Sequence, residues 1–161
     1  MSRTNLCPCG TGRPYAQCCE VFHSGAREAP DAESLMRSRY TGFALKKVDY
    51  LWRTLHRAHA DRAATQAEGL AAIRYAADGY RYMGLTVLDR EAPDAKGVAR
   101  VLFHAKMFQK GRDVSFVECS DFAHDGEGWR YLAGSPVLMR DLRAPLAGLT
   151  IARFRDRPQP T

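Results

Sequence analysis

Apolar side chains recur every three or four positions in the segment DAESLMRSRYTGFALKK. Asp31 stands where a helix N-cap is expected, because its side chain can accept a hydrogen bond from a free backbone N–H. The apolar residues that would share one helical face are Met36, Tyr40, Phe43 and Ala44. The pattern predicts a core helix that begins just after Asp31.

Two further helical segments are predicted downstream. Asp49 is expected to cap a short second helix after a bend near residues 48 and 49; Leu51 and Leu55 share one side of it, and Trp52 lies beside that apolar stripe. A third helical region covers ADRAATQAEGLAAIRYAAD, where Leu70 and Ile73 offer an inward face. Its glycine, Gly69, is expected to weaken this helix.

Beyond Gly79 the apolar period changes from that of a helix to that of a strand. Met83, Leu85 and Val87 alternate in YRYMGLTVLDRE, and five apolar residues alternate in GVARVLFHAKMFQ. RDVSFVECSDF continues the pattern, AHDGEG is a turn, and WRYLAG is the last clear strand. Helices followed by sequential strands predict an α+β fold, with an antiparallel sheet wrapped around the helices.

The C-terminal stretch DLRAPLAGLTIARFRDRPQPT is harder to place. Leu149, Ile151 and Phe154 could form an edge strand or pack as a tail, and the pattern does not separate these alternatives. Its arginines outnumber its acidic residues, which could bind phosphate backbones or acidic protein surfaces, although solvated basic ends are common.

Length and composition suggest one main domain with a small appendage. The 161 residues are 45% hydrophobic and 26% charged, and no apolar run approaches the length that spans a bilayer. The opening MSRTNLCPCG lacks the apolar core of a secretory signal. We therefore expect a cytoplasmic protein without membrane association, in which thiols stay reduced.

Four of the five cysteines lie within CPCGTGRPYAQCC, and they are the main candidates for chemistry. Cys7, Cys9, Cys18 and Cys19 offer four soft thiolates, the donor set of a tetrahedral structural zinc site. A redox-active thiol set, an iron–sulfur cluster and free structural cysteines are the alternatives. His23 is a spare ligand that we place outside the set, because structural zinc sites close at four ligands.

The segment CPCGTGRPYAQCC resembles the SEC-C motif, with its pattern C-x-C-G-x-G-x-x-Y-x-x-C-[CH]. The resemblance implies that Cys7, Cys9, Cys18 and Cys19 hold zinc, and that the element contacts a partner protein rather than performing chemistry. LMRSRYTGFALKKVDYLWRTLH, ECSDF and GWRYLAG are similar to the YchJ family of small bacterial proteins. That resemblance implies a zinc knuckle over residues 1–25 and a cone-shaped domain of the nuclear transport factor 2 (NTF2) type over residues 26–161.

Cones of this type often enclose a pocket, so we sought side chains that could line one. His104 lies on the more polar face of its strand and Glu118 alternates with Phe116 on the next, while Trp52 is a large aromatic candidate. A buried Glu118 could act as a general base with His104 as its partner, or the two could form an ordinary solvated pair. The arginines of RSRY are expected on the polar side of their helix.

Three functions remain open at this point. The first is an interaction protein with a structural zinc knuckle that binds another protein. The second is a small-molecule binder or enzyme that uses the cone, with Trp52, His104 and Glu118 as pocket candidates. The third is a nucleic-acid or ribosome-associated factor that uses the knuckle and the arginine-rich C-terminal stretch.

Overall fold

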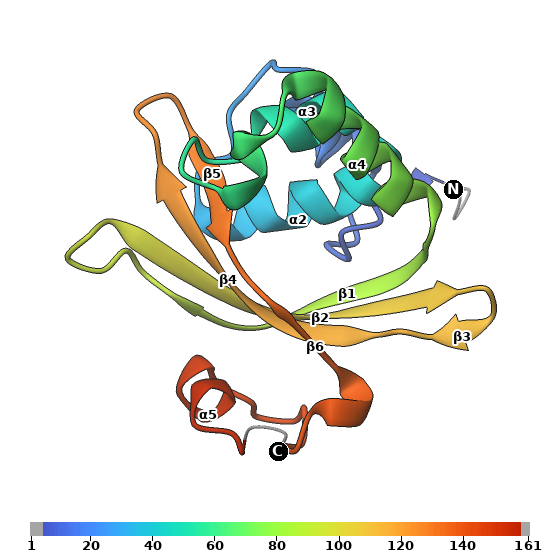
Figure 1. The fold of residues 1–161 in the computed structure, drawn as a ribbon, viewed down its shortest axis with the longest axis vertical. Coiled ribbons are helices and arrows are strands. Elements are labelled where there is room, and N and C mark those ends of the chain that lie inside the picture. The colour runs from blue at the N-terminus through green and yellow to red at the C-terminus, as the bar shows by residue number, and fades with distance from the viewer. Residues whose placement is uncertain (1–4, 159–161) are drawn as a thin grey trace.

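Three helices lie against one face of a strongly curved antiparallel sheet, and the C-terminal segment covers the other face (Figure 1). The computed structural model describes residues 5–158. No helix in this part of the chain is long and apolar enough to cross a bilayer. The α+β class predicted from the change of period is confirmed.

The first long helix begins where the sequence predicts. Asp31 is its N-cap, and the Asp31 carboxylate accepts a 2.7 Å hydrogen bond from the backbone N–H of Ser34. Met36 and Tyr40 are buried on the predicted face. The helices are α1 (Glu20–His23), α2 (Ala32–Ala44), α3 (Val48–Arg53), α4 (Gln66–Asp78) and α5 (Ile151–Arg155).

Helix α3 begins before the residue predicted to cap it. The chain reverses at Lys46, which has a left-handed φ of 59°, and Lys47 precedes the helix without a side-chain cap. Asp49 therefore lies in the first turn of α3, so the prediction that it caps the helix was wrong. The bend comes two residues earlier than predicted because Lys46 adopts a conformation that its side chain does not signal.

Helix α4 is closed at its start by a reciprocal cap that the pattern analysis missed. Thr65 accepts from the backbone of Glu68, and the Glu68 side chain accepts from the backbone of Thr65. Gly69 has a packing role here: a Cβ at this position would lie 2.0 Å from Cζ3 of Trp52. Glycine lowers the helix propensity of α4, but its missing side chain lets α4 pack directly on the indole ring of Trp52.

The sheet is built from sequential antiparallel strands in the order β1-β2-β4-β5, with β3 paired to β2 and β6 paired to β4. The strands are β1 (Arg81–Glu91), β2 (Val98–Gln109), β3 (Arg112–Asp113), β4 (Phe116–His124), β5 (Trp129–Ala133) and β6 (Pro136–Leu138). The connection between β4 and β5 falls within the predicted turn AHDGEG.

Side chains of β2 divide the sheet into two faces. The predicted apolar set all faces α2 and is buried: Ala99, Val101, Phe103, Ala105 and Met107. Met83 of β1, which alternates with Leu85 and Val87 in the sequence, is 52% exposed, whereas Leu85 is buried. A register shift between Tyr82 and Gly84 interrupts the alternation and turns Tyr82 toward the core instead.

The C-terminal stretch forms a second, smaller core on the face of the sheet away from α2 (Figure 1). Leu149, Ile151 and Phe154 pack there against Leu102 and Val117. The backbone N–H of Ile151 also donates a 2.8 Å hydrogen bond to Asp89 on β1. Of the two predicted alternatives, the segment therefore packs as a tail rather than forming an edge strand, and its short helix α5 covers apolar sheet surface.

Candidate functional site

The four N-terminal cysteines gather at one buried point. The Sγ atoms of Cys7, Cys9, Cys18 and Cys19 all lie within 4.8 Å of one another. Cys9 and Cys18 bring their sulfurs to 3.5 Å. A tetrahedral zinc–thiolate site holds its sulfurs about 3.8 Å apart, so the donor set fits a metal of this kind.

The proximity of the sulfurs makes them share protons. Hydrogen bonds from Cys19 and Cys9 lower the pKa of Cys7 far below its usual range, while the same contact with Cys7 raises the pKa of Cys19. A divalent cation replaces such shared protons with bonds to all four sulfurs. The buried cluster therefore has the geometry and the donor chemistry that could hold a metal ion.

The backbone between the cysteines forms a tight return. Leu6 and Pro14 form an isolated antiparallel bridge, and the N–H of Cys7 donates 2.8 Å to the carbonyl of Arg13. A turn of 3₁₀ helix over Tyr15–Gln17 then leads to the second cysteine pair, and Cys19 caps α1. The pair thus lies at a helix start, which lets both adjacent thiols turn toward one point.

The cysteine loop is docked on the main domain. Arg37 of α2 donates from Nη1 to the carbonyl of Cys9 at 2.6 Å, and the Cys7 sulfur lies 3.6 Å from the Thr41 hydroxyl. Gly10 has a φ of +84°, and a Cβ there would lie 3.0 Å from the carbonyl oxygen of Leu85 on β1. The cysteines thus belong to the same buried cluster as Leu35 and Met36 of α2 and the inner face of β2.

His23 links the knuckle to α2 instead of joining the cysteines. Its Nε2 donates to the carbonyl of Ser38 at 2.8 Å, which leaves Nδ1 to accept from the Tyr15 hydroxyl at 2.8 Å. The ring also packs on Tyr50, with centroids 4.6 Å apart. Burial lowers the pKa of His23. A neutral ring with both nitrogens engaged is consistent with the prediction that it stands outside the ligand set.

A cavity of about 570 Å³ lies between the helices and the inner face of the sheet. This volume falls within the range of about 300 to 1,000 Å³ typical of small-molecule sites. The partly exposed Ile73, Tyr80 and Gln109 belong to its lining, so the cavity reaches the surface beside α4. Most of its lining is apolar and aromatic, including Tyr40, Phe43, Tyr82, Phe103, Met107 and Phe116.

Arg39 brings a guanidinium into this apolar space. Only 8% of the residue is exposed, although arginines of the RSRY segment were predicted on a polar helix face. Its Nη1 donates to the carbonyl of Leu51 at 2.8 Å and to the Thr54 hydroxyl at 2.6 Å, and the group lies 5.0 Å from the centre of the Tyr131 ring. Burial lowers the pKa of Arg39 to about 10. The prediction for Arg39 was wrong because α2 is buried on more than its apolar stripe.

Glu118 is the predicted pocket residue that does line the cavity. It is 9% exposed, and its Oε2 accepts from the Ser120 hydroxyl at 2.5 Å and from the Tyr131 hydroxyl at 3.3 Å. Burial raises the pKa of Glu118, and these hydrogen bonds and Arg39 only partly oppose that rise. Glu118 is thus a carboxyl group that can exchange a proton nearer neutral pH than an exposed glutamate.

The other two pocket candidates lie elsewhere. His104 pairs in register with Val117, and its neighbours in the chain, Phe103 and Ala105, occupy the inner face, so His104 points to the opposite side of the sheet. Trp52 packs under α4, with the Arg62 guanidinium 4.5 Å from its ring centre. Neither lines the cavity, which corrects the proposed pairing of His104 with Glu118.

His59 is the histidine that the cavity does include, and the pattern analysis missed it. Its Nδ1 accepts from the backbone N–H of Asp61 at 3.0 Å, and its ring packs on Tyr131 at 5.1 Å. The chain after α3 pairs with β5, because His56 and Tyr131 bond through their backbones. This pairing carries His59 to the polar end of the cavity, and no local sequence signal reveals it.

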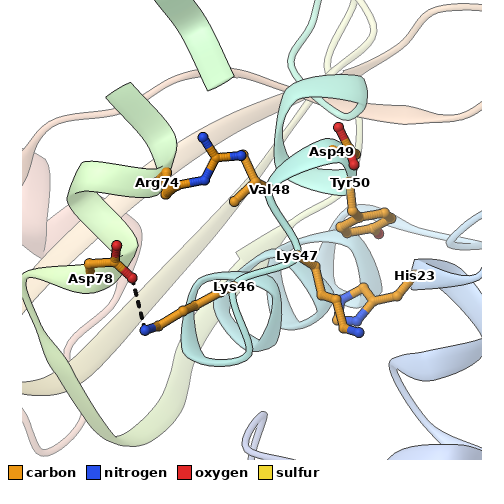
Figure 2. A pocket seen from close by; sticks show the side chains of 8 residues that line it. All are labelled: His23, Lys46, Lys47, Val48, Asp49, Tyr50, Arg74 and Asp78. Atoms are coloured by element: carbon orange, nitrogen blue, oxygen red, sulfur yellow. Dashed lines mark ion pairs between the residues drawn. The ribbon is translucent and has the colours of Figure 1, made fainter. Parts of the chain in front are cut away.

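A second hollow of about 400 Å³ lies on the outside of the helical layer, where α1, α3 and α4 meet (Figure 2). Lys46 and Asp78 face each other across it in a 2.8 Å ion pair. Its charges are mixed, since Lys47 and Arg74 stand with Asp49 in the same lining. Because basic and acidic side chains lie together here, the hollow has no excess charge of one sign that would select a charged ligand.

Two of the C-terminal arginines make contacts within their own stretch. Arg157 packs over the ring of Phe154 at 4.0 Å and bonds its carbonyl, while Arg140 lies 3.9 Å from Asp141. Residues 159–161 of that stretch lie outside the described part of the chain.

The comparisons with known proteins agree with this geometry. The SEC-C motif matches residues 3–20, and the domain described as "YchJ, middle NTF2-like domain" matches residues 31–134. The protein is thus an NTF2-like α+β protein that carries a SEC-C element. Since the domain match covers well over half of the sequence, the chain belongs to the YchJ family.

One curated relative carries the family name, and two solved structures share the fold. A curated protein named "UPF0225 protein YchJ" from Shigella dysenteriae serotype 1 (strain Sd197) is 36% identical over 132 residues, which are 82% of this chain and 84% of that protein. The solution structure of RPA3114, a SEC-C motif containing protein from Rhodopseudomonas palustris, has a TM-score of 0.70 at 29% identity and covers 81% of this chain and 98% of its own. A crystal structure of a SEC-C motif containing protein from Psychrobacter arcticus has a TM-score of 0.67 at 25% identity and covers 89% of each chain.

Proposed function

We propose that the protein binds a small, largely apolar molecule in the cavity of its cone, and that a zinc ion held by the four cysteines stabilises the fold. The observation that carries the proposal is the cavity: a space of about 570 Å³ with aromatic walls and two buried ionisable side chains, Arg39 and Glu118. A cavity that served packing alone would be expected to close or to lack charged groups, because both are costly in a core.

The zinc site is assigned a structural role. Cys7, Cys9, Cys18 and Cys19 would occupy all four positions of a tetrahedral ion, so none is left for water or substrate. When bound, the metal supplies cross-linking of the loop and no Lewis-acid chemistry. Hydrogen bonds of Arg37 and His23 hold the cysteine loop on α2. The opposite side of α2 contributes Arg39 to the cavity.

A cavity-filling variant tests the binding function. Ala76 of α4 lines the cavity, and Ala72 of the same helix is exposed. Native mass spectrometry of the purified protein, compared with its denatured mass, should reveal a retained small molecule in addition to one zinc ion. Ala76→Phe should lose that molecule and keep the zinc, whereas Ala72→Phe should keep both. If Ala76→Phe folds and retains the molecule as well as Ala72→Phe does, the cavity is not the binding site.

A second candidate function is protein interaction through the knuckle, which the exposed edge of the cysteine loop favours. Thr11, Arg13, Ala16 and Gln17 remain exposed after the loop docks on α2. The test is affinity isolation with the wild-type chain and with Ala16→Arg, which places a large charge at the centre of that edge. A specific partner should bind only the wild type. Equal recovery of every bound protein by both chains would contradict this role.

A further inference from the structure

The guanidinium of Arg39 is only half satisfied by the protein. Nη1 makes both of its hydrogen bonds, to the carbonyl of Leu51 and to Thr54. Nε and Nη2 donate to no group among residues 5–158, and no carboxylate there comes within ion-pair distance of Arg39. Neither atom is among the fully buried unpaired donors, so this edge of the guanidinium is open to the cavity that Arg39 lines, where a ligand can accept from it.

The free edge has the geometry of an anion clamp. Nε and Nη2 present two parallel N–H groups, the fork that binds a carboxylate through both oxygens. The anchored Nη1 and the Tyr131 ring beside the group restrict how the fork can turn. A ligand carboxylate would therefore meet a donor pair whose orientation is already set, at little entropic cost.

The remaining groups at this end of the cavity limit the ligand to a single negative charge. Arg39 is the one lysine or arginine among the residues that line it. Glu118 on β4 and Asp61 in the turn before α4 are acidic, while His59 and Tyr131 are neutral near pH 7. A dianion such as a phosphate monoester would lack a second cation and would face these carboxylates.

Glu118 can coexist with a bound carboxylate by taking up a proton. Its burial already favours the neutral acid, and a second carboxylate nearby would favour it further. As a neutral acid it becomes a hydrogen-bond donor, so a site with one arginine and one protonated glutamate can hold both oxygens of a carboxylate. Beyond this polar end the cavity walls are aromatic and aliphatic, including Tyr40, Phe43 and Phe103.

From this arrangement we propose that the cavity is selective for a monocarboxylic acid with an apolar body, whose carboxylate pairs with the Nε–Nη2 edge of Arg39 while its body lies among Tyr40, Phe43 and Phe103. The proposal rests on the small-molecule function proposed above and narrows its ligand class. The single cation at one end of the cavity selects an acidic group on the ligand, and the apolar walls select an apolar body.

Matched acids and alcohols test the selectivity on the zinc-loaded full chain. The probes are 4-phenylbutanoate with 4-phenylbutanol and octanoate with 1-octanol, titrated at pH 7 while backbone amide shifts of the cavity residues are followed by NMR. We expect each acid to bind at least about tenfold more tightly than its alcohol. If acid and alcohol bind equally well in the cavity, the small-molecule function stands and the carboxylate selectivity is overturned. If neither pair shifts the cavity residues, both proposals fail.

Variants assign the effect to Arg39. Arg39→Lys keeps the charge and removes the fork, so acid affinity should fall about tenfold while alcohol affinity is unchanged. The matched control, Arg74→Lys on the outer hollow, should change neither. Should Arg39→Lys not fold, Glu118→Gln provides the second measurement: it removes the competing negative charge, so the acid should bind more tightly at pH 8 and the alcohol as before. Weaker acid binding by Glu118→Gln would overturn the proposal.

Discussion

Arg37 on α2 donates from Nη1 to the carbonyl oxygen of Cys9 at 2.6 Å, and this bond fixes the cysteine loop to the helix beneath it. In Arg37→Ala that carbonyl, which belongs to a buried residue, loses its charged donor. Loss of a hydrogen bond to a charged group costs about 1 to 3 kcal/mol. We expect a lower free energy of unfolding in urea and faster amide exchange across the cysteine loop, with the zinc content unchanged.

The control for this change is Arg27→Ala. Arg27 is exposed, and its side chain makes no hydrogen bond or ion pair with the described residues. The free energy of unfolding of Arg27→Ala should lie within about 0.5 kcal/mol of that of the wild type. If both variants behave alike, the Arg37 contact does not hold the loop in place.

Removal of one cysteine should release the metal. Cys18→Ser takes away one of four sulfurs, and the remaining three cannot close a structural site. The zinc content per chain, measured by inductively coupled plasma mass spectrometry, should fall from about one to well below one. A tenfold excess of chelator should remove the remaining zinc from the variant, whereas the wild type should keep its zinc under the same treatment.

Cys119→Ser is the matched control for the metal experiment. Cys119 packs on the far face of the sheet with Val137 and Leu149, away from the cysteine cluster. It should retain full zinc content. A Cys18→Ser protein that still holds one tightly bound zinc would show that the four thiols are not the site.

Two glycines at the ends of one helical span should respond to alanine with opposite signs. At Gly69 a Cβ would lie 2.0 Å from the Trp52 ring, and such overpacking costs about 1 to 3 kcal/mol. Gly79 closes α4 with a φ of −78°, and its nearest contact would be an ordinary 3.5 Å, so alanine there should stabilise by up to about 1 kcal/mol. Urea unfolding of both variants checks the pair; equal effects would mean that Trp52 does not contact α4 so closely.

Glu118 should make stability depend on pH in a defined direction. Burial raises its pKa in the folded protein above the ordinary value of 4.5, so the folded state holds the proton more tightly than the unfolded state. The cost of ionising Glu118 is absent below pH 4.5 and appears as the pH rises through the folded pKa. Arg39 from α2 and Tyr131 from β5 reduce this cost without removing it.

Glu118→Gln removes the titrating group while keeping an acceptor for Ser120. The variant should therefore gain stability relative to the wild type as the pH is raised from 4.5 to 8, because only the wild type must ionise a buried carboxyl group. Chemical denaturation at both pH values gives the difference. A relative stability that is constant with pH, or that moves in the wild type's favour, would show that burial does not raise the pKa of this carboxyl.

Local patterns predicted the elements whose signals are short in range. The alternation from Ala99 to Met107 predicted both the strand and its buried face, and Asp31 predicted the start of α2. The spacing of the four cysteines predicted that their sulfurs meet. In each case neighbouring residues carry the information, because a helix or strand period and a ligand spacing are local properties of the chain.

The polar end of the cavity could not be predicted in this way. Arg39 follows Arg37 by two residues and looks like a second surface arginine, yet α2 is enclosed by the knuckle on one side and the sheet on the other. His104 looks as eligible as Glu118, but the pairing of Phe103 with Glu118 places His104 on the opposite face. His59 lines the cavity only because the chain after α3 pairs with β5.

The sequence by itself determined that this protein has a four-cysteine knuckle, a helical first half and an antiparallel sheet, and membership in its family rests on those residues. Only the tertiary structure decided that the knuckle packs on α2, that the C-terminal stretch covers the far face of the sheet, and that Arg39, His59 and Glu118 share one cavity. The physical reason is range: periodicity records which face of an element is apolar, whereas burial of a charged residue depends on elements that are far away in the chain.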